Sequence, residues 1–246
     1  MSGEVTLVAP AGSVTPRAIA KLDQLVRTLP PYALVGGLAV SVRLGFTHRT
    51  TLDLDAVTDD QQQMVEVLVD AGNERRGDSV ILEPDLKLDI LDVSEGDPEY
   101  VPFLTHRFAF DARVDVSVRV IGEAGEELAS ATVPTARPSA LVAMKLGISE
   151  GVGRQRDPNK VGSDAFDVVR LLQRYGPEVL ADELVEFASP ALVDAVERLA
   201  TQHLVDGADR TAGAIVRSSV RGVERVSADQ IERIGNELVR SLRRRD

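Results

Sequence analysis

Two aspartates separated by one residue, Asp53 and Asp55, are the strongest candidates for chemistry in this sequence. Their surroundings alternate apolar and polar residues, which predicts a strand. Side chains two apart on a strand share a face, so both carboxylates are expected on one face, with Leu52 and Leu54 on the other. Two anions roughly 6–7 Å apart repel each other, and a hard cation such as Mg²⁺ relieves that repulsion. The pattern therefore predicts metal-dependent phosphoryl or nucleotidyl transfer. The alternative is an exposed edge strand that carries two acids.

A double glycine, Gly36-Gly37, separates an expected strand (33–35) from an expected helix (38–44). Glycine lets backbone N–H groups approach a phosphate closely, and the start of a helix adds a favourable partial positive charge. The pair predicts a phosphate seat, and an ordinary tight turn is the alternative.

A second acidic strand, expected at 86–93, supplies Asp89 as a third carboxylate, either a metal ligand or the group that takes a proton from an attacking hydroxyl. Lys87 shares its face and is expected to reach substrate phosphates, although a lysine whose charged end simply reaches solvent fits equally well. Asp92 lies on the opposite face and is expected at a strand end in water.

The C-terminal half contributes three further candidates. Lys145 falls on an apolar helix face, where a lysine needs an anion, either a structural carboxylate or a substrate phosphate. Asp164 and Asp167 are three residues apart and share a helical face, so they could serve the reaction. Alternatively, they are acids that favour the first turn of a helix capped by Ser163.

Composition excludes several classes. The 246 residues include no cysteine, so disulfides, thiolate catalysis and Cys-ligated zinc are ruled out. The three histidines show no metal-like spacing, and no signal peptide or membrane span is recognisable, so we expect a cytoplasmic protein. The net charge of −11 argues against binding nucleic acid by bulk charge. Any RNA contact would fall to local basic residues, namely Arg154, Arg156, Lys160 and the arginines at 243–245.

The order of elements predicts an α+β protein with an N-terminal mixed sheet and flanking helices over 1–135, followed by a helical domain over 136–246. Residues 1–14 are expected to be loose or an edge segment, and 94–104 a loop. Strands are expected at 33–35, 52–57, 79–82, 86–93, 107–110, 114–121 and 127–133. Helices are expected at 15–29, 38–44, 59–71, 139–148, 163–175, 178–187, 190–204, 211–221 and 228–244.

Five motifs in this order resemble the AbiEii/MenT family of nucleotidyltransferase-like toxins, within the DNA polymerase β-type nucleotidyltransferase superfamily. They are Leu-Val-Gly-Gly-Leu-Ala, His-Arg-Thr-Thr-Leu-Asp-Leu-Asp, Leu-Lys-Leu-Asp-Ile, Ala-Met-Lys-Leu and Lys-Val-Gly-Ser-Asp-Ala-Phe-Asp. The resemblance implies that Mg²⁺ and a nucleoside triphosphate bind at the glycine turn and the two aspartates. It also implies substrate contacts from Arg49 and Thr51, and roles for Lys87 with Asp89 and for Lys145 with Asp167 and Asp164.

The resemblance further implies transfer of a nucleotide to an RNA such as the 3′ end of tRNA, together with a partner antitoxin. Gly37 stands where the family also uses serine, and this removes a hydroxyl near the phosphates. Two other functions fit the same residues: transfer to a small molecule such as an aminoglycoside or to a protein hydroxyl, and a non-catalytic nucleotide-binding module.

Overall fold

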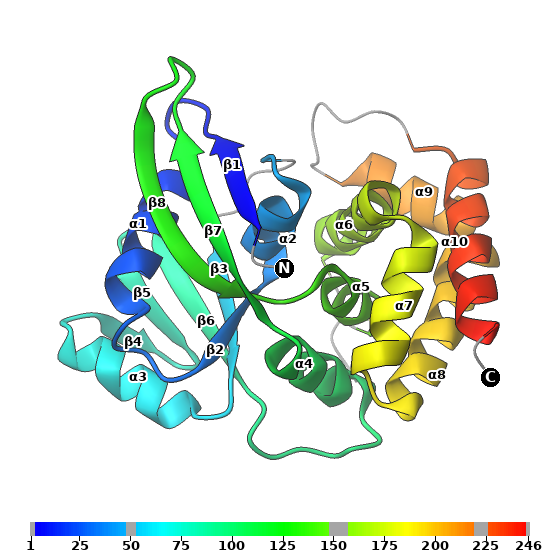
Figure 1. Cartoon of the computed structure of the whole chain (residues 1–246), viewed down its shortest axis with the longest axis horizontal. Coiled ribbons are helices and arrows are strands. Elements are labelled where there is room, and N and C mark those ends of the chain that lie inside the picture. The colour runs from blue at the N-terminus through cyan, green and yellow to red at the C-terminus, as the bar shows by residue number, and fades with distance from the viewer. Residues whose placement is uncertain (1–2, 48–52, 148–156, 219–225, 245–246) are drawn as a thin grey trace. The chain divides into compact units, whose positions relative to one another are not determined.

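The chain is described by a computed structural model that covers residues 3–47, 53–147, 157–218 and 226–244. Its contacts divide into two compact units (Figure 1). Unit 1 comprises 1–96 and 109–137, and unit 2 comprises 97–108 and 138–246. The segment 97–108 therefore groups with the C-terminal helices, although it lies within the range expected for the first domain. No helix in these described ranges is long and apolar enough to cross a membrane.

Unit 1 is built on one mixed sheet of eight strands in the order β1-β7-β8-β2-β3-β6-β5-β4. The neighbours β2 and β3 run antiparallel, whereas β3 and β6 run parallel. The strands are β1 (Glu4–Val8), β2 (Tyr32–Val35), β3 (Asp53–Thr58), β4 (Glu74–Arg76), β5 (Ser79–Glu83), β6 (Leu86–Asp92), β7 (Val114–Ile121) and β8 (Glu127–Thr135). Together with the helical remainder of the chain, this sheet confirms the α+β class.

Three helices pack on the sheet of unit 1: α1 (Thr15–Leu25), α2 (Gly36–Leu44) and α3 (Gln61–Asp70). The helix α1 contacts β7 and β8, α2 contacts β2 and β3, and α3 contacts β4 to β6. Arg43 fixes the C-terminal end of α2, because its Nε and Nη2 donate to the carbonyls of Ala136 (2.7 Å) and Thr135 (2.6 Å). The helix that begins at the double glycine is thus held at both ends, at one by β2 and at the other by the end of β8.

Unit 2 is helical in its described part. Its elements after the sheet are α5 (Pro138–Gly147), α6 (Pro158–Tyr175), α7 (Pro177–Phe187), α8 (Pro190–Ala200), the π-helical turn η2 (Thr201–Val205), α9 (Ala208–Arg217) and α10 (Ala228–Arg243). Proline occupies the first position of α6, α7 and α8, where its missing N–H costs no hydrogen bond. Apolar side chains of these helices form the buried core, among them Leu141, Phe166, Leu180 and Leu238.

Several expected elements differ from the structure. Residues 107–110 are not a strand, because they lie in the helix α4 (Val101–Asp111), which also takes up the end of the expected 94–104 loop. The short strands β1 and β4 occur in segments with weak alternation, and β1 lies at the edge of the sheet. Asp60 rather than Asp59 caps α3, where its carboxylate accepts from the backbone N–H of Gln63.

The helix α6 begins at Pro158, five residues before the expected start, and is capped by Asp157 instead of Ser163. Sequence periodicity is weak where a helix starts in a polar segment, and this hid the first turn of α6.

Candidate active site

The strand β3 presents Asp53 and Asp55 on one face. Its burial alternates: Leu54 and Ala56 lie in the core, whereas Asp55 is partly buried and the side chain of Asp53 is 50% exposed. The arrangement is the one expected from the spacing. Asp53 therefore keeps contact with water, whereas Asp55 lies deeper in the sheet.

The parallel pairing of β3 with β6 places two more charged residues beside the aspartates. Asp53 pairs in register with Lys87, and Asp55 with Asp89. The Lys87 Nζ lies 2.9 Å from Asp89 Oδ2 and 3.8 Å from Asp53 Oδ2. The hydrogen bond to Asp89 raises the pKa of Lys87 above its usual value, burial opposes that shift, and the charges of the neighbouring aspartates add to it. One face of two adjacent strands thus carries three carboxylates and one ammonium group.

Ser79 on β5 is a member of this cluster that the sequence patterns did not reveal. It stands opposite Asp89 in the antiparallel register of β5 and β6, and its hydroxyl hydrogen-bonds Asp89 Oδ1. The two Asp89 oxygens therefore have different partners, Ser79 and Lys87. The tight turn at Pro84-Asp85 was a usable signal, because a short hairpin places the start of one strand beside the end of the next.

The turn between β2 and α2 meets the second aspartate directly. Gly36 has φ +69°, a backbone conformation that favours glycine. A β-carbon at Gly36 would lie 1.9 Å from Asp55 Oδ2 and 2.7 Å from its Cγ, so only glycine fits beside that carboxylate. Gly37 follows in the first turn of α2, where backbone N–H groups have no partner within the helix. The glycine turn and the acidic strand are therefore one structural unit.

The donor set allows a test of the Mg²⁺ expectation. No group of three His, Cys, Asp or Glu side chains is arranged to hold a metal ion in the part of the chain that the structure describes. Asp89 is turned toward Ser79 and Lys87, which leaves Asp53 and Asp55 as the donor pair. Mg²⁺ keeps several water ligands and is commonly bound by one or two carboxylates together with substrate phosphates. Two carboxylates beside a glycine turn fit that requirement, and a three-carboxylate set is not assembled.

Unit 2 brings Lys145, Asp164 and Asp167 together. Lys145 on α5 contacts Asp164 on α6, and its Nζ lies 3.1 Å from Asp167 Oδ2. The side chain of Lys145 is 7% exposed and that of Asp167 is 0% exposed. Both aspartates lie inside α6 and not in its first turn, so favouring the helix dipole does not account for them. The anion that Lys145 needs is provided by these two carboxylates.

Arg49 and Thr51 lie outside the described residues, as do Arg154 and Arg156. Lys160 is described: it is exposed in the first turn of α6, not in the loop that its neighbours suggested. Of the C-terminal arginines, Arg243 is paired with Glu197 at 2.6 Å.

Comparison with known proteins identifies the class to which this chain belongs. The family model described as "Nucleotidyl transferase AbiEii toxin, Type IV TA system" matches residues 22–238. The chain belongs to the AbiEii family and is a nucleotidyltransferase. This match confirms the resemblance recognised in the five motifs.

A comparison with curated proteins found no match to the chain. Among solved structures, the antibiotic-resistance factor ANT(2'')-Ia, determined in solution, matches with 16% identity and a TM-score of 0.44. The match covers 77% of this chain and 97% of that one. A superposition at this level does not carry substrate or mechanism from one protein to the other.

Proposed function

We propose that this enzyme transfers a nucleoside monophosphate from a Mg²⁺-bound nucleoside triphosphate to a hydroxyl of an RNA, such as the 3′ end of tRNA. The observation that carries the proposal is the register of β3 and β6, which gathers Asp53, Asp55, Lys87 and Asp89 on one sheet face. Membership in a family of toxins of type IV toxin–antitoxin systems supports action as a toxin with a partner antitoxin.

In the proposed reaction the acceptor hydroxyl oxygen forms a bond to the α-phosphorus, the bond between the α- and β-phosphates breaks, and pyrophosphate leaves. Asp53 and Asp55 would hold the metal ion, which when bound offsets negative charge on the phosphate oxygens. Gly36 and Gly37 would seat the phosphates at the start of α2. The close approach of Asp55 to Gly36 supports this, because it keeps the metal-binding and phosphate-binding elements adjacent.

Asp89 would accept the proton from the acceptor hydroxyl. Its hydrogen bonds from Ser79 and Lys87 fix the orientation of the carboxylate, and each carboxylate oxygen has a second lone pair for a proton. Lys87 lies between Asp89 and Asp53 and would offset charge that grows during transfer. Arg49 and Thr51 as substrate contacts, Lys145 and Asp167 as catalytic residues, and Asp164 as a substrate contact rest on the family motifs.

A transfer assay with separate acceptors tests the proposal. The protein is incubated with Mg²⁺, each of the four α-labelled ribonucleoside triphosphates, and pools of tRNA, protein or aminoglycoside in turn. Label is expected in tRNA, lost in Asp55→Asn and retained in Asp92→Asn, whose carboxylate is exposed at the end of β6. Label confined to the protein or aminoglycoside pool would overturn the RNA acceptor. Full activity of Asp55→Asn would overturn the assigned site.

A growth assay tests the toxin role separately. Expression of the chain in a host cell is expected to arrest growth, and Asp55→Asn is expected to relieve the arrest. Growth arrest of equal strength with Asp55→Asn would separate toxicity from nucleotide transfer.

A further inference from the structure

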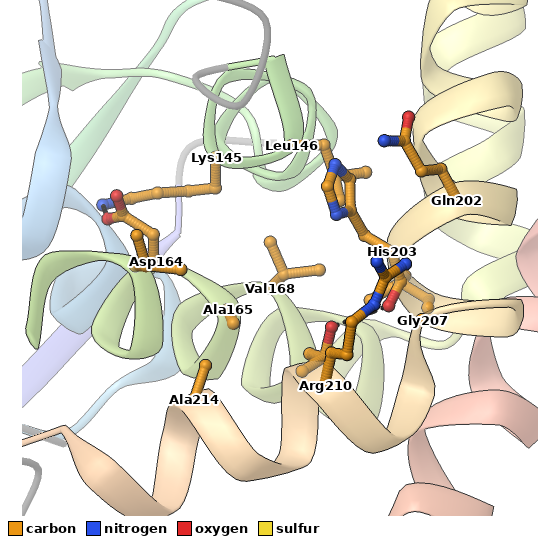
Figure 2. A pocket seen from close by; sticks show the side chains of 13 residues that line it. Lys145, Leu146, Asp164, Ala165, Val168, Gln202, His203, Gly207, Arg210 and Ala214 are labelled. Carbon is orange, nitrogen blue, oxygen red and sulfur yellow. Dashed lines mark hydrogen bonds and ion pairs between the residues drawn. The ribbon is translucent and has the colours of Figure 1, made fainter. Parts of the chain in front are cut away.

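A pocket of about 270 Å³ is lined by residues of unit 2. It is enclosed by α5, α6, η2 and α9. Figure 2 shows Lys145 and Asp164 on one side and Gln202, His203 and Arg210 on the opposite side, with Val168 between them. The volume is close to the lower end of the roughly 300–1,000 Å³ of small-molecule sites, so the pocket suits a small metabolite and not a polymer.

The π-helical turn η2 shapes one wall of this pocket. A π-helical turn is rare and often occurs at functional sites. Specific contacts hold this turn against α9: Thr211 Oγ1 donates to the carbonyl of His203 at 2.7 Å. A β-carbon at Gly207 would lie 2.5 Å from the carbonyl oxygen of Gln202, so glycine is required where the chain turns from η2 into α9. These contacts hold Gln202 and His203 at the pocket wall.

The lining has an apolar part and a polar rim. Leu146, Ala165 and Val168 provide an apolar surface, whereas Gln202 and Arg210 are exposed at the rim. Most small-molecule sites have this composition, with an apolar lining and a few polar groups that orient the ligand. An apolar ligand body would therefore be buried against Leu146, Ala165 and Val168 while its polar end meets η2 and α9.

Arg210 indicates which charge the polar end of the ligand carries. It forms no hydrogen bond or ion pair with another of the described residues, although Asp194, Glu197 and Asp206 line an adjacent hollow that it also borders. A guanidinium group presents several N–H donors in a planar fork that matches phosphate and carboxylate oxygens. An available arginine at the mouth of an apolar pocket thus favours a ligand with one anionic group.

We propose that this pocket binds a small molecule that has an apolar body and carries one phosphate or carboxylate group. Arg210 binds the anionic group, Gln202 adds a hydrogen bond, and the apolar part lies against Leu146, Ala165 and Val168. The pocket is lined by residues of unit 2, and two of them, Lys145 and Asp164, also belong to the function proposed above. Binding is therefore measured separately from transfer.

The expected effect of this ligand on nucleotide transfer, by contrast, rests on the function proposed above. Lys145 and Asp164 line one side of the pocket, so a bound ligand would cover their ion pair. If Lys145 takes part in transfer, the bound ligand lowers the transfer rate.

Binding is measured by calorimetry on the full chain without Mg²⁺ or triphosphate. One arm uses the four nucleoside monophosphates as probes, and the other uses benzoate and 2-naphthoate. A probe from one arm is expected to bind, and the arm identifies whether phosphate or carboxylate is the anion. Arg210→Ala is expected to weaken binding roughly 10- to 100-fold, as the loss of a charge-assisted hydrogen bond predicts.

Two control variants and one pocket-filling variant make the result specific. Arg174→Ala removes an exposed arginine of α6 that does not line the pocket, and it is expected to leave binding unchanged. Asp53→Asn is also expected to leave binding unchanged, which distinguishes this pocket from the triphosphate site. Ala165→Phe is expected to fill the pocket and abolish binding, and circular dichroism confirms that this variant is folded.

The proposal is overturned if no probe of either arm binds, if Arg210→Ala binds as well as the parent protein, or if Asp53→Asn removes the binding. Loss of transfer activity in Asp53→Asn tests the function proposed above and leaves this binding result unaffected.

Discussion

The carboxylate of Asp55 occupies the space that a β-carbon on Gly36 would need. The hypothetical β-carbon would lie 1.9 Å from Asp55 Oδ2, and Gly36 itself has φ +69°. The register of β2 and β3, which pairs Val35 with Asp55, brings the two together. Gly36 and Asp55 are 19 positions apart in the chain but depend on each other, and a change in either is expected to disturb both.

Gly36→Ala tests this dependence. A positive φ costs a non-glycine residue roughly 1–2 kcal/mol, and here the methyl group also displaces the Asp55 carboxylate. We expect the variant to lose most nucleotide transfer, measured as incorporation of α-labelled triphosphate. Gly72→Ala is the matched control, because Gly72 has φ +88° and nothing within 4 Å of its hypothetical β-carbon. Equal loss of activity in both variants would contradict a specific role of the Gly36–Asp55 contact.

Asp53→Asn and Asp55→Asn test the metal-binding pair. Replacing an anionic ligand with a neutral amide weakens the hold on a hard cation, so we expect each variant to lose Mg²⁺-dependent triphosphate binding. We expect transfer to fall by about 100-fold or more. Calorimetry with a non-hydrolysable triphosphate, with and without Mg²⁺, measures the first effect. Asp92→Asn on the neighbouring strand is the control and is expected to bind normally. Unchanged Mg²⁺ dependence in both variants would exclude these carboxylates as ligands.

Ser79→Ala tests how Asp89 is positioned. The variant removes the hydrogen bond to Asp89 Oδ1 but keeps the ion pair with Lys87. We expect the maximal rate of transfer to fall by about 10-fold with little change in the apparent affinity for triphosphate, because Ser79 acts through Asp89. The pH–rate profile is expected to shift along the pH axis, and Ser79→Thr, which keeps the hydroxyl, is expected to restore it. A pure loss of stability without a change in that profile would assign Ser79 a structural role only.

Lys87 predicts how stability depends on pH. Its pKa is raised above 10.5 in the folded protein, chiefly by the hydrogen bond to Asp89. A group with a raised pKa contributes fully below its unfolded value and loses that contribution as the pH rises through the folded value. The stability difference between the parent protein and Lys87→Met is therefore expected to stay constant at neutral pH and to shrink above 10.5. Urea unfolding at a series of pH values measures it, and a difference that shrinks already at neutral pH would contradict the assignment.

Lys145→Met tests the buried cluster of unit 2. Removing the ammonium group takes one charged partner from two buried carboxylates, and breaking a buried ion pair costs up to about 3–5 kcal/mol. Urea unfolding is expected to show that loss in the free energy of unfolding. Lys160→Met is the control: that side chain is exposed, so its substitution is expected to stay within about 0.5 kcal/mol. A small effect at Lys145 would indicate that Asp164 and Asp167 are satisfied without it.

Local patterns in the sequence were sufficient for much of the fold. Alternation identified β3 and β6 and the face that carries their charged residues, because the period of a strand is fixed by backbone geometry. Apolar periodicity located most helices of unit 2 for the same reason. Local patterns were insufficient for α4, because a short apolar run such as Phe108-Ala109-Phe110 fits a strand as well as a helix, and only packing in the folded chain selects the helix.

For the candidate site, too, some features follow from the sequence and others only from the tertiary structure. The sequence by itself determined which residues can do chemistry, namely the two aspartates of β3, Asp89 with Lys87, and the glycine turn. The tertiary structure alone decided that β3 and β6 run parallel in a register that pairs Asp55 with Asp89, and that Gly36 touches Asp55. It also decided that Ser79 binds Asp89 and that Lys145 has two buried carboxylate partners. Side-chain type and period are properties of neighbouring residues, whereas register and burial depend on segments far apart in the chain.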